Sequence, residues 1–348
     1  MQLSGRKKFR PIKSSNYDIH NKCNLTCEGC YYFVSDQKTT NRRPSEAEYD
    51  RFFESERDRG VNYPVLSGGE PSLNPVALRS AARFWNQGMV YTNGVKKLDP
   101  ELPFRIAISL WGKRERNDVL RGEASYDRAF KSATGDPRTM MLLTISRENI
   151  DDIREVVEDC VRRDLAIALQ DFSMTSTYMD LLGDENAERT PYYRFSTSED
   201  NLSLRIEDRL KIADIVDEVI ELYPKHVIQT KALNNWVHRS VQIHDIDPET
   251  NLATDCAFLT ADYHKGFTYD LKPAGGKQCC VPEFDCRDCR VSIVTMFTRL
   301  THLAKTMRAS RSDYEELVEL RDVMMRYFFW DWDLAVKAEA AGSELQFA

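Results

Sequence analysis

Apolar residues in the first half of the chain form short runs, which alternate with longer stretches where they recur every three or four positions. The short runs predict β-strands, and the longer stretches predict amphipathic helices. Strands are predicted at residues 16–19, 63–66, 89–92, 105–110, 140–145 and 165–170. Helices are predicted between them at residues 45–59, 75–86, 126–133 and 149–163, with Ser45 as a cap of the first. This alternation is typical of a parallel α/β sheet.

The chain changes character after the sixth predicted strand. Residues 173–201 are polar and are interrupted by Gly183 and Pro191. A segment of this length without regular structure is usually a lid, a binding loop or disordered, and we favour a lid or substrate loop. A helix at 206–222 and a strand near 227–230 are predicted next, and residues after 291 have the spacing of helices with an apolar packing face.

The composition fits a globular protein of 348 residues, of which 42% are hydrophobic and 30% charged. Because a single core stops growing near about 250–300 residues, we expect one large domain with a smaller appendage. No apolar run approaches the roughly 20 residues that span a bilayer, and the basic N-terminus lacks a secretory signal, so a cytoplasmic protein without a membrane partner is predicted. The net charge of −7 argues against nucleic acid as a partner.

Three cysteines near the start of the chain, Cys23, Cys27 and Cys30, are spaced Cys-x3-Cys-x2-Cys. Such a dense group of thiolates can bind one metal centre, either zinc or an iron–sulfur cluster. Three protein ligands leave one metal position open for chemistry or for a substrate. The alternatives are a structural zinc site with a fourth ligand nearby, such as His20, and unligated core cysteines.

A second motif, Gly68-Gly69-Glu70-Pro71, follows the strand predicted at 63–66. Glycines at a strand end let the backbone approach a ligand closely, and a carboxylate there can hold an ammonium group. The motif lies about forty residues after the cysteines, and together the two resemble the signature of the radical S-adenosylmethionine (SAM) superfamily.

The resemblance implies a partial (β/α)6 TIM-like barrel and a 4Fe–4S cluster on the three cysteines, whose fourth iron is chelated by SAM. It implies reductive cleavage of SAM to a 5′-deoxyadenosyl radical that abstracts hydrogen from a substrate, with a flavodoxin- or ferredoxin-type protein as electron donor. Gly68 and Gly69 would contact the methionine end of SAM, and Glu70 would bind its amino group. Cys23, Cys27 and Cys30 are therefore the expected catalytic and metal-binding residues.

Other cofactor contacts are expected at the carboxyl ends of the strands, where sites on such folds gather. The candidates there are Thr92, Asn93, Ser109, Ser146 and Gln170. Ser109 is the candidate for the SAM ribose, since in the resembling family a polar residue after the fourth strand often binds it. Each of these residues could instead serve a turn or a helix cap.

The chain departs from the family pattern at Gly29, where many members carry an aromatic or bulky apolar residue beside the adenine. The adenine contact is expected to shift to Tyr31 or Tyr32, although this tyrosine pair could also be ordinary packing.

A second group of cysteines lies further along the chain. It consists of Cys256, Cys279, Cys280, Cys286 and Cys289. The sequence between the first two predicts a hairpin with cysteines at its flanks, and the last two form a Cys-x2-Cys pair. Adjacent side chains of an extended segment point in opposite directions, so only one of Cys279 and Cys280 is expected to be a ligand. The remaining Cys160 is expected to be a core residue.

This second group resembles the auxiliary-cluster domains of the superfamily, called twitch and SPASM. The resemblance implies a second, auxiliary 4Fe–4S cluster on Cys256, Cys286, Cys289 and one of the adjacent pair; a structural zinc is the alternative. The expected domains are the barrel at 1–235, the auxiliary domain at 236–292 and terminal helices at 293–348.

The leading interpretation is a radical SAM enzyme that oxidises or dehydrogenates a small biosynthetic metabolite. The alternative is a peptide maturase that forms a crosslink or an oxidised side chain in a ribosomally made precursor. Only 22 residues precede Cys23, which argues against an N-terminal leader-binding domain. A non-catalytic iron–sulfur or zinc protein is the third class considered.

Overall fold

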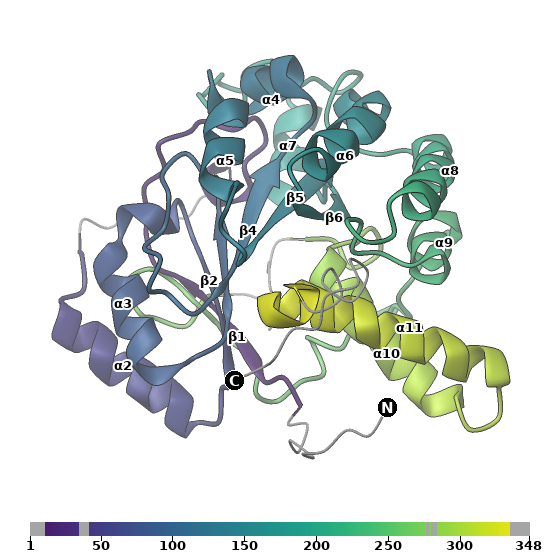
Figure 1. The fold of residues 1–348 in the computed structure, drawn as a ribbon. Coiled ribbons are helices and arrows are strands. Elements are labelled where there is room, and N and C mark those ends of the chain that lie inside the picture. The colour runs from purple at the N-terminus through teal and green to yellow at the C-terminus, as the bar shows by residue number, and fades with distance from the viewer. Residues whose placement is uncertain (1–10, 35–41, 276–278, 280–283, 335–348) are drawn as a thin grey trace.

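The computed structural model describes residues 11–34, 42–275, 279 and 284–334, and its core is one curved, open parallel sheet (Figure 1). The strands are β1 (Ser14–Asp18), β2 (Tyr63–Ser67), β3 (Met89–Thr92), β4 (Arg105–Leu110), β5 (Thr139–Ile145), β6 (Ala166–Asp171) and β7 (Gly266–Phe267). They lie in the order β6-β5-β4-β3-β2-β1-β7, and every paired neighbour is parallel. The predicted α/β partial barrel is confirmed, and all six predicted strands are present.

The helices of the described residues are α1 (Tyr31–Val34), α2 (Glu46–Asp58), α3 (Pro75–Phe84), α4 (Arg114–Arg121), α5 (Ser125–Ala133), α6 (Ile153–Val161), α7 (Ser176–Gly183), α8 (Ile206–Leu222), α9 (Lys231–Arg239), α10 (Ser292–Thr306) and α11 (Arg311–Phe328). Of these, α2, α3, α5, α6 and α8 lie close to the predicted helices, and α10 and α11 lie in the region predicted to be helical after residue 291. The sequence analysis did not predict α1, α4, α7 and α9. Two short 3-10 helices, η1 (Pro71–Leu73) and η2 (Arg147–Asp152), complete them. Ser45 and Glu48 cap α2 reciprocally, since each side chain accepts a hydrogen bond from the other residue's backbone N–H (3.4 and 2.8 Å).

Two differences from the prediction concern the region after β6. The strand predicted near 227–230 is wrong: Val227 makes only an isolated bridge to Ile167, because Thr230 already caps α9. The hairpin predicted before Cys279 is present as a tight turn, in which Thr268 N–H donates to the Lys272 carbonyl (2.8 Å). Its first two residues form β7, which pairs with β1 and adds a seventh strand.

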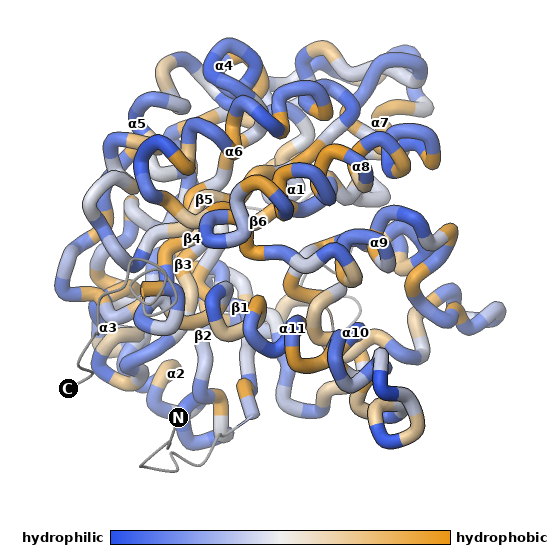
Figure 2. The backbone as a smooth tube through the Cα atoms, turned by 45° about the vertical axis from the view of Figure 1, so that its right-hand side comes forward, coloured by the Kyte–Doolittle hydropathy of each residue, from blue (hydrophilic) through white to orange (hydrophobic). Residues whose placement is uncertain are grey.

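Two hydrophobic cores lie on the two faces of the sheet. The outer core joins the strands to α2, α3, α5, α6 and α8, and the inner core joins them to α9, α10 and α11. Along β5 successive residues alternate between the cores, with Met140 and Leu142 facing in and Met141 and Leu143 facing out. Strands covered on both faces have continuous apolar sequences. Figure 2 shows this concentration of hydrophobic residues in the central strands.

The C-terminal helices fill part of the concave face. Tyr63 donates a hydrogen bond to the Phe328 carbonyl (2.6 Å), and the hydroxyls of Tyr91 and Tyr327 are 3.0 Å apart. Buried Arg105 pairs with Asp333 at 3.4 Å. The C-terminal aromatic residues therefore have the packing role that was expected. Because they do not cover the carboxyl ends of the strands, a functional site can lie there. None of the helices in the described part of the chain is both long and apolar enough to cross a bilayer.

Candidate functional site

The three N-terminal cysteines lie on the loop between β1 and α1, at the carboxyl edge of the sheet. Burial, together with the negative charge of Cys27, raises the pKa of Cys23 to about 11. Burial, followed by the charges of Cys27 and Cys23, likewise raises the pKa of Cys30. The three thiols are therefore electrostatic neighbours, and their ionised forms need a nearby positive charge such as a metal centre. Over the described residues, no three His, Cys, Asp or Glu side chains form a ready-made site for a single metal ion.

The glycine pair after β2 packs against the backbone of the cysteine loop. Gly69 N–H donates to the His20 carbonyl (2.7 Å), and Glu70 N–H donates to the Lys22 carbonyl (2.8 Å). A Cβ on Gly69 would lie 2.3 Å from the Lys22 carbonyl oxygen, and Gly68 adopts φ +117°. Neither position accommodates a side chain. The two glycines thus hold the cysteine loop against the sheet, a role that the sequence analysis did not anticipate.

The Glu70 carboxylate is buried and joins its own loop after β2 to the end of β3 at the sheet edge. Its Oε1 accepts from Ser72 N–H (2.9 Å) and the Thr92 hydroxyl (2.5 Å), and its Oε2 accepts from Asn93 N–H (2.8 Å). Pro71 begins η1 directly after it. A carboxylate offers about four acceptor positions, so three protein donors leave one for a ligand. Thr92 and Asn93, both predicted as cofactor contacts, are therefore brought to Glu70.

Two polar side chains donate hydrogen bonds to the cysteine sulfurs. Asn93 Nδ2 lies 3.5 Å from Cys23 Sγ, and Arg121 Nε lies 3.4 Å from Cys27 Sγ. Arg121 is 5% exposed and also donates to the Ser109 carbonyl. Donors of this kind stabilise thiolates and tune the metal centre that the thiolates hold. The sequence analysis missed Arg121, because nothing in the polar sequence of α4 distinguishes its last residue from a solvated arginine.

Gly29, the departure from the family pattern, has no room for a side chain. Its φ is +61°, and a Cβ there would lie 3.1–3.2 Å from Leu202, Phe172 and Tyr178. Phe172 follows β6, and its ring meets that of Trp111 edge to face at 5.7 Å. Aromatic side chains from elsewhere in the chain therefore occupy the space beside the third cysteine.

The segment predicted as a lid lies directly on the cysteine loop. The Glu28 carboxylate is fully buried and accepts from Arg194 N–H (2.8 Å), Ser196 N–H (3.2 Å) and the Ser196 hydroxyl (2.7 Å). Gly29 N–H donates to the Tyr192 carbonyl (2.7 Å). The Tyr192 ring stacks on Phe33 with centroids 4.6 Å apart. These contacts hold residues 192–196 against the motif that contains the three cysteines.

The other predicted contacts are at the strand ends, but they do not all face the cysteines. Ser109 lies beside Arg121, whereas Ser146 precedes η2 and its buried hydroxyl has no hydrogen-bond partner. Gln170 donates to the Thr144 hydroxyl (3.1 Å) and faces the C-terminal helices. Tyr32 is 2% exposed and packs on Phe33, so it is a core residue of α1.

Four distal cysteines come together beneath the C-terminal helices. Cys256, Cys279, Cys286 and Cys289 are all buried. Burial, together with the charges of the other three thiols, raises the pKa of Cys289 to about 12. The four predicted ligands are thus neighbours, whereas Cys280 lies outside the described residues. Cys160 is fully buried on α6 in the outer core, as expected.

The chain combines a parallel partial barrel with a three-cysteine loop after the first strand and a Gly-Gly-Glu-Pro loop after the second, an arrangement that resembles radical SAM proteins. No family model matches the sequence. The chain is 26% identical to the sporulation killing factor maturation protein SkfB of Bacillus subtilis (strain 168) over 168 residues, which are 44% of this chain and 40% of SkfB. This chain therefore matches less than half of that relative's length.

Solved structures of two proteins, SuiB and anSMEcpe, share the fold. Streptococcus suis SuiB bound to S-adenosylmethionine superposes with a TM-score of 0.52 at 14% identity, over 74% of this chain and 58% of SuiB. SuiB bound to its precursor peptide SuiA gives 0.53 with the same coverage. The protein anSMEcpe with bound AdoMet gives 0.52 at 15% identity, over 85% of this chain and 86% of that protein. In its motifs, its fold and its sequence similarity to SkfB, the chain thus resembles the radical SAM superfamily.

Proposed function

We propose that this protein is a radical SAM peptide maturase that oxidises or crosslinks residues of a precursor peptide. The observation that carries the proposal is the joint arrangement of the three-cysteine loop and the Gly68–Pro71 loop, locked together at Gly69 and Glu70. The first interpretation favoured a small metabolite. The peptide alternative is now preferred, because SkfB is named for maturation of a killing factor and SuiB has been solved with a precursor peptide.

The residues at the sheet edge fit a 4Fe–4S cluster with SAM. Three soft thiolates would ligate the cluster, and Asn93 and Arg121 would donate hydrogen bonds to their sulfurs. Bound together, the reduced cluster and SAM supply a 5′-deoxyadenosyl radical that removes a hydrogen atom from the substrate. Three hydrogen bonds to Glu70 leave one acceptor position on its carboxylate for an ammonium group. Arg121, at the same edge of the sheet, forms no ion pair with a carboxylate among the described salt bridges.

The protein's own part is positioning and exclusion of water. Glu70 fixes the ends of β2 and β3 relative to each other, and Glu28 fixes residues 192–196 over the cysteine loop. Four distal cysteines would hold an auxiliary 4Fe–4S cluster, which would supply an acceptor for the one electron that the substrate radical loses to complete its two-electron oxidation. A flavodoxin- or ferredoxin-type donor is the proposed source of the reducing electron.

The test is cleavage of SAM by the anaerobically reconstituted protein with dithionite as reductant. We expect 5′-deoxyadenosine from the wild type, none from Cys27→Ala, and wild-type amounts from Cys160→Ala, which removes a buried cysteine outside both groups. No 5′-deoxyadenosine from the wild type, at full iron content, would refute the radical SAM activity.

The peptide substrate and the auxiliary cluster need a separate measurement. Short peptides encoded beside the gene are incubated with the protein and SAM, and the loss of two hydrogen atoms per modification is followed by mass spectrometry. Cys286→Ala should still cleave SAM but leave the peptide unmodified. If the protein modified a small metabolite and no peptide, the peptide proposal would be refuted and the small-metabolite interpretation would be preferred again.

A further inference from the structure

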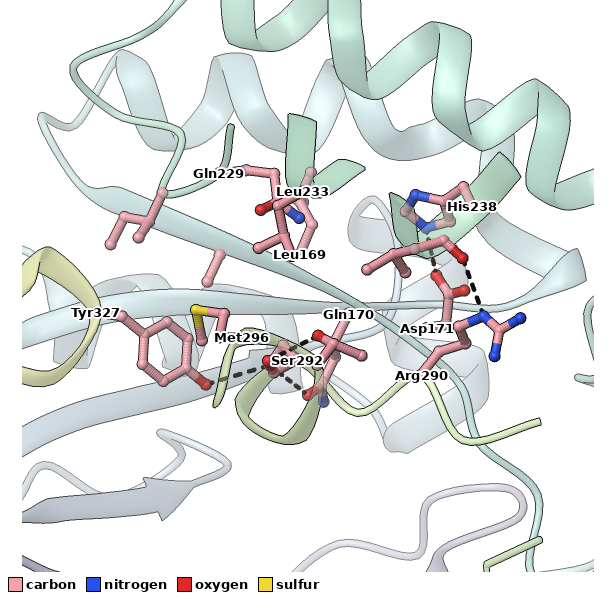
Figure 3. Close-up of a pocket in the computed structure, with 14 residues that line it drawn as sticks. Leu169, Gln170, Asp171, Gln229, Leu233, His238, Arg290, Ser292, Met296 and Tyr327 are labelled. Carbon is pink, nitrogen blue, oxygen red and sulfur yellow. Dashed lines mark hydrogen bonds and ion pairs between the residues drawn. The ribbon is translucent and has the colours of Figure 1, made fainter. Parts of the chain in front are cut away.

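A small pocket lies between β6 and the C-terminal helices, away from the cysteine loop (Figure 3). Its polar lining comes from β6, from the segments before and within α9, from the start of α10 and the residues before it, and from α11. These polar residues are Gln170, Asp171, Gln229, His238, Arg290, Ser292, Thr295 and Tyr327. Ala168, Leu233 and Met296 supply apolar walls. The pocket has room for a group about the size of one water molecule.

One oxygen of the buried Asp171 carboxylate has no partner. Asp171 is 5% exposed, and its Oδ1 lies 2.9 Å from His238 Nε2, as Figure 3 shows. Its Oδ2 is fully buried and has no hydrogen-bond partner in the protein. Buried carboxylate oxygens are almost always hydrogen-bonded, so an unpartnered one that lines a pocket indicates a missing donor.

The hydrogen bonds around His238 show that this oxygen is an acceptor. His238 Nδ1 faces Asn234 Oδ1 (2.7 Å) and the Asn234 carbonyl (3.1 Å), which are both acceptors, so Nδ1 carries a proton. The Asn234 amide orientation is fixed, because its Nδ2 donates to the Ala213 carbonyl (2.9 Å). One proton then lies between Nε2 and Asp171 Oδ1. Whichever of these two atoms holds it, Oδ2 is unprotonated and free to accept.

The charges near the pocket favour an uncharged donor over an ammonium group. The Arg290 guanidinium is fixed by hydrogen bonds to the carbonyls of Val237 (3.0 Å), Val241 (3.2 Å) and two further residues. Arg209 and Asp171 both act electrostatically on it, as does Asp288. A cation would meet this fixed positive charge, and an anion would meet Oδ2. The opposite wall is neutral, since the Ser292 hydroxyl lies 3.4 Å from both Gln170 Oε1 and the Tyr327 hydroxyl.

We propose that this pocket is a substrate subsite for an uncharged hydrogen-bond donor of about the size of a water molecule, the terminal N–H2 of a carboxamide group, which donates to Asp171 Oδ2. The identification of that group as part of a peptide rests on the proposed function. The pocket itself does not, because its geometry comes from residues outside the cysteine loop. Arg290 directly follows Cys289, so a group bound here lies next to the distal cysteines.

The test compares two probes of nearly equal shape, acetamide and acetone, by saturation-transfer NMR on the full-length protein. Only acetamide carries a donor, so the wild type should bind it about tenfold more tightly, the difference expected for one hydrogen bond to a charged acceptor. Methylammonium, tested in the same way, should bind no better than acetone. Equal binding of acetamide and acetone, no binding of either, or tighter binding of methylammonium would each overturn the proposal.

Two variants locate the site. Asp171→Leu replaces the carboxylate with an apolar side chain of similar size and removes the acceptor, so the preference for acetamide should disappear. Asp164→Leu is the control, because Asp164 forms an exposed pair with His226 (3.1 Å) at the other end of β6. The control should keep the preference; its loss there, or its survival in Asp171→Leu, would refute the assignment.

If Asp171→Leu does not fold, wild-type crystals soaked with acetamide decide instead. Density within hydrogen-bond distance of Asp171 Oδ2 is expected, and a water molecule alone at that place would refute the subsite. These measurements do not involve SAM cleavage. Failure of the subsite therefore leaves the radical SAM activity standing, and failure of that activity leaves acetamide binding unchanged.

Discussion

Replacing Glu28 with glutamine should release residues 192–196 from the cysteine loop. The wild-type carboxylate accepts three hydrogen bonds from Arg194 and Ser196, and Arg194 Nε lies 3.5 Å from Oε2. A glutamine that keeps its oxygen toward Ser196 presents its amide N–H2 to the Arg194 N–H. One hydrogen bond to a charged group is then lost, and two donors face each other without an acceptor.

The size of the effect follows from the burial of the site. A hydrogen bond to a charged group is worth about 1.5–3 kcal/mol, and an unsatisfied buried donor costs about 1–3 kcal/mol. A total of about 3 kcal/mol is a reasonable expectation for a fully buried carboxylate. Because tenfold corresponds to about 1.4 kcal/mol, the opened state should become about a hundredfold more populated. The Tyr192–Phe33 stack and the Gly29–Tyr192 hydrogen bond remain, so the opening should be local.

Amide hydrogen exchange followed by mass spectrometry measures this opening. Peptides that contain Gly29, Arg194 and Ser196 should exchange about a hundredfold faster in Glu28→Gln, whereas peptides from β4 and β5 should not change. Glu188→Gln, a substitution of an exposed carboxylate in the same segment, is the matched control and should behave as the wild type. Unchanged exchange at residues 192–196, or an equal increase throughout the sheet, would refute the interpretation that Glu28 holds residues 192–196 locally against the cysteine loop.

Three further predictions concern the rest of the site. Gly69→Ala should destabilise the protein by about 1–3 kcal/mol in urea unfolding and reduce iron retention, because its Cβ would clash with the Lys22 carbonyl. The control Gly183→Ala, whose Cβ meets no atom within 4 Å, should change neither stability nor iron retention. Equal losses in the two variants would contradict this explanation. Arg121→Gln should lower the reduction potential of the reconstituted N-terminal cluster, because it removes a positive charge beside Cys27; an EPR-monitored redox titration measures this potential. The control Arg128→Gln, at an exposed arginine, should leave the potential unchanged. An equal shift in both variants would contradict the role of the Arg121–Cys27 contact. Burial raises the pKa of Asp18 to about 6 from its ordinary 3.8, so the folded state holds the proton more tightly than the unfolded state and stability falls as pH rises from about 4 to 6. Asp18→Asn should therefore match the wild type near pH 4 and exceed its free energy of unfolding by about 2–3 kcal/mol near pH 8, and a constant difference across that range would refute the shift.

Periodicity was enough to predict the barrel strands, because each strand of a buried parallel sheet is a short, continuous apolar run. It failed at residues 227–230, where an apolar pair only connects α8 to α9 and is too short to form a ladder. Periodicity also did not predict that the first two residues of the hairpin at residue 266 form a strand of the main sheet. These two residues form the edge strand β7 only because they pair with β1.

The sequence by itself determined the chemistry of the site: two cysteine groups of defined spacing and a Gly-Gly-Glu-Pro loop at the end of a strand. Spacing along the chain carries that information because ligands on one loop stay close in any fold. The contacts of Arg121 with Cys27, of Glu28 with Ser196 and of Asp171 with His238 join residues 67 or more positions apart. Such contacts leave no local pattern, since they depend on how distant strands, loops and helices pack, and only the tertiary structure decided them.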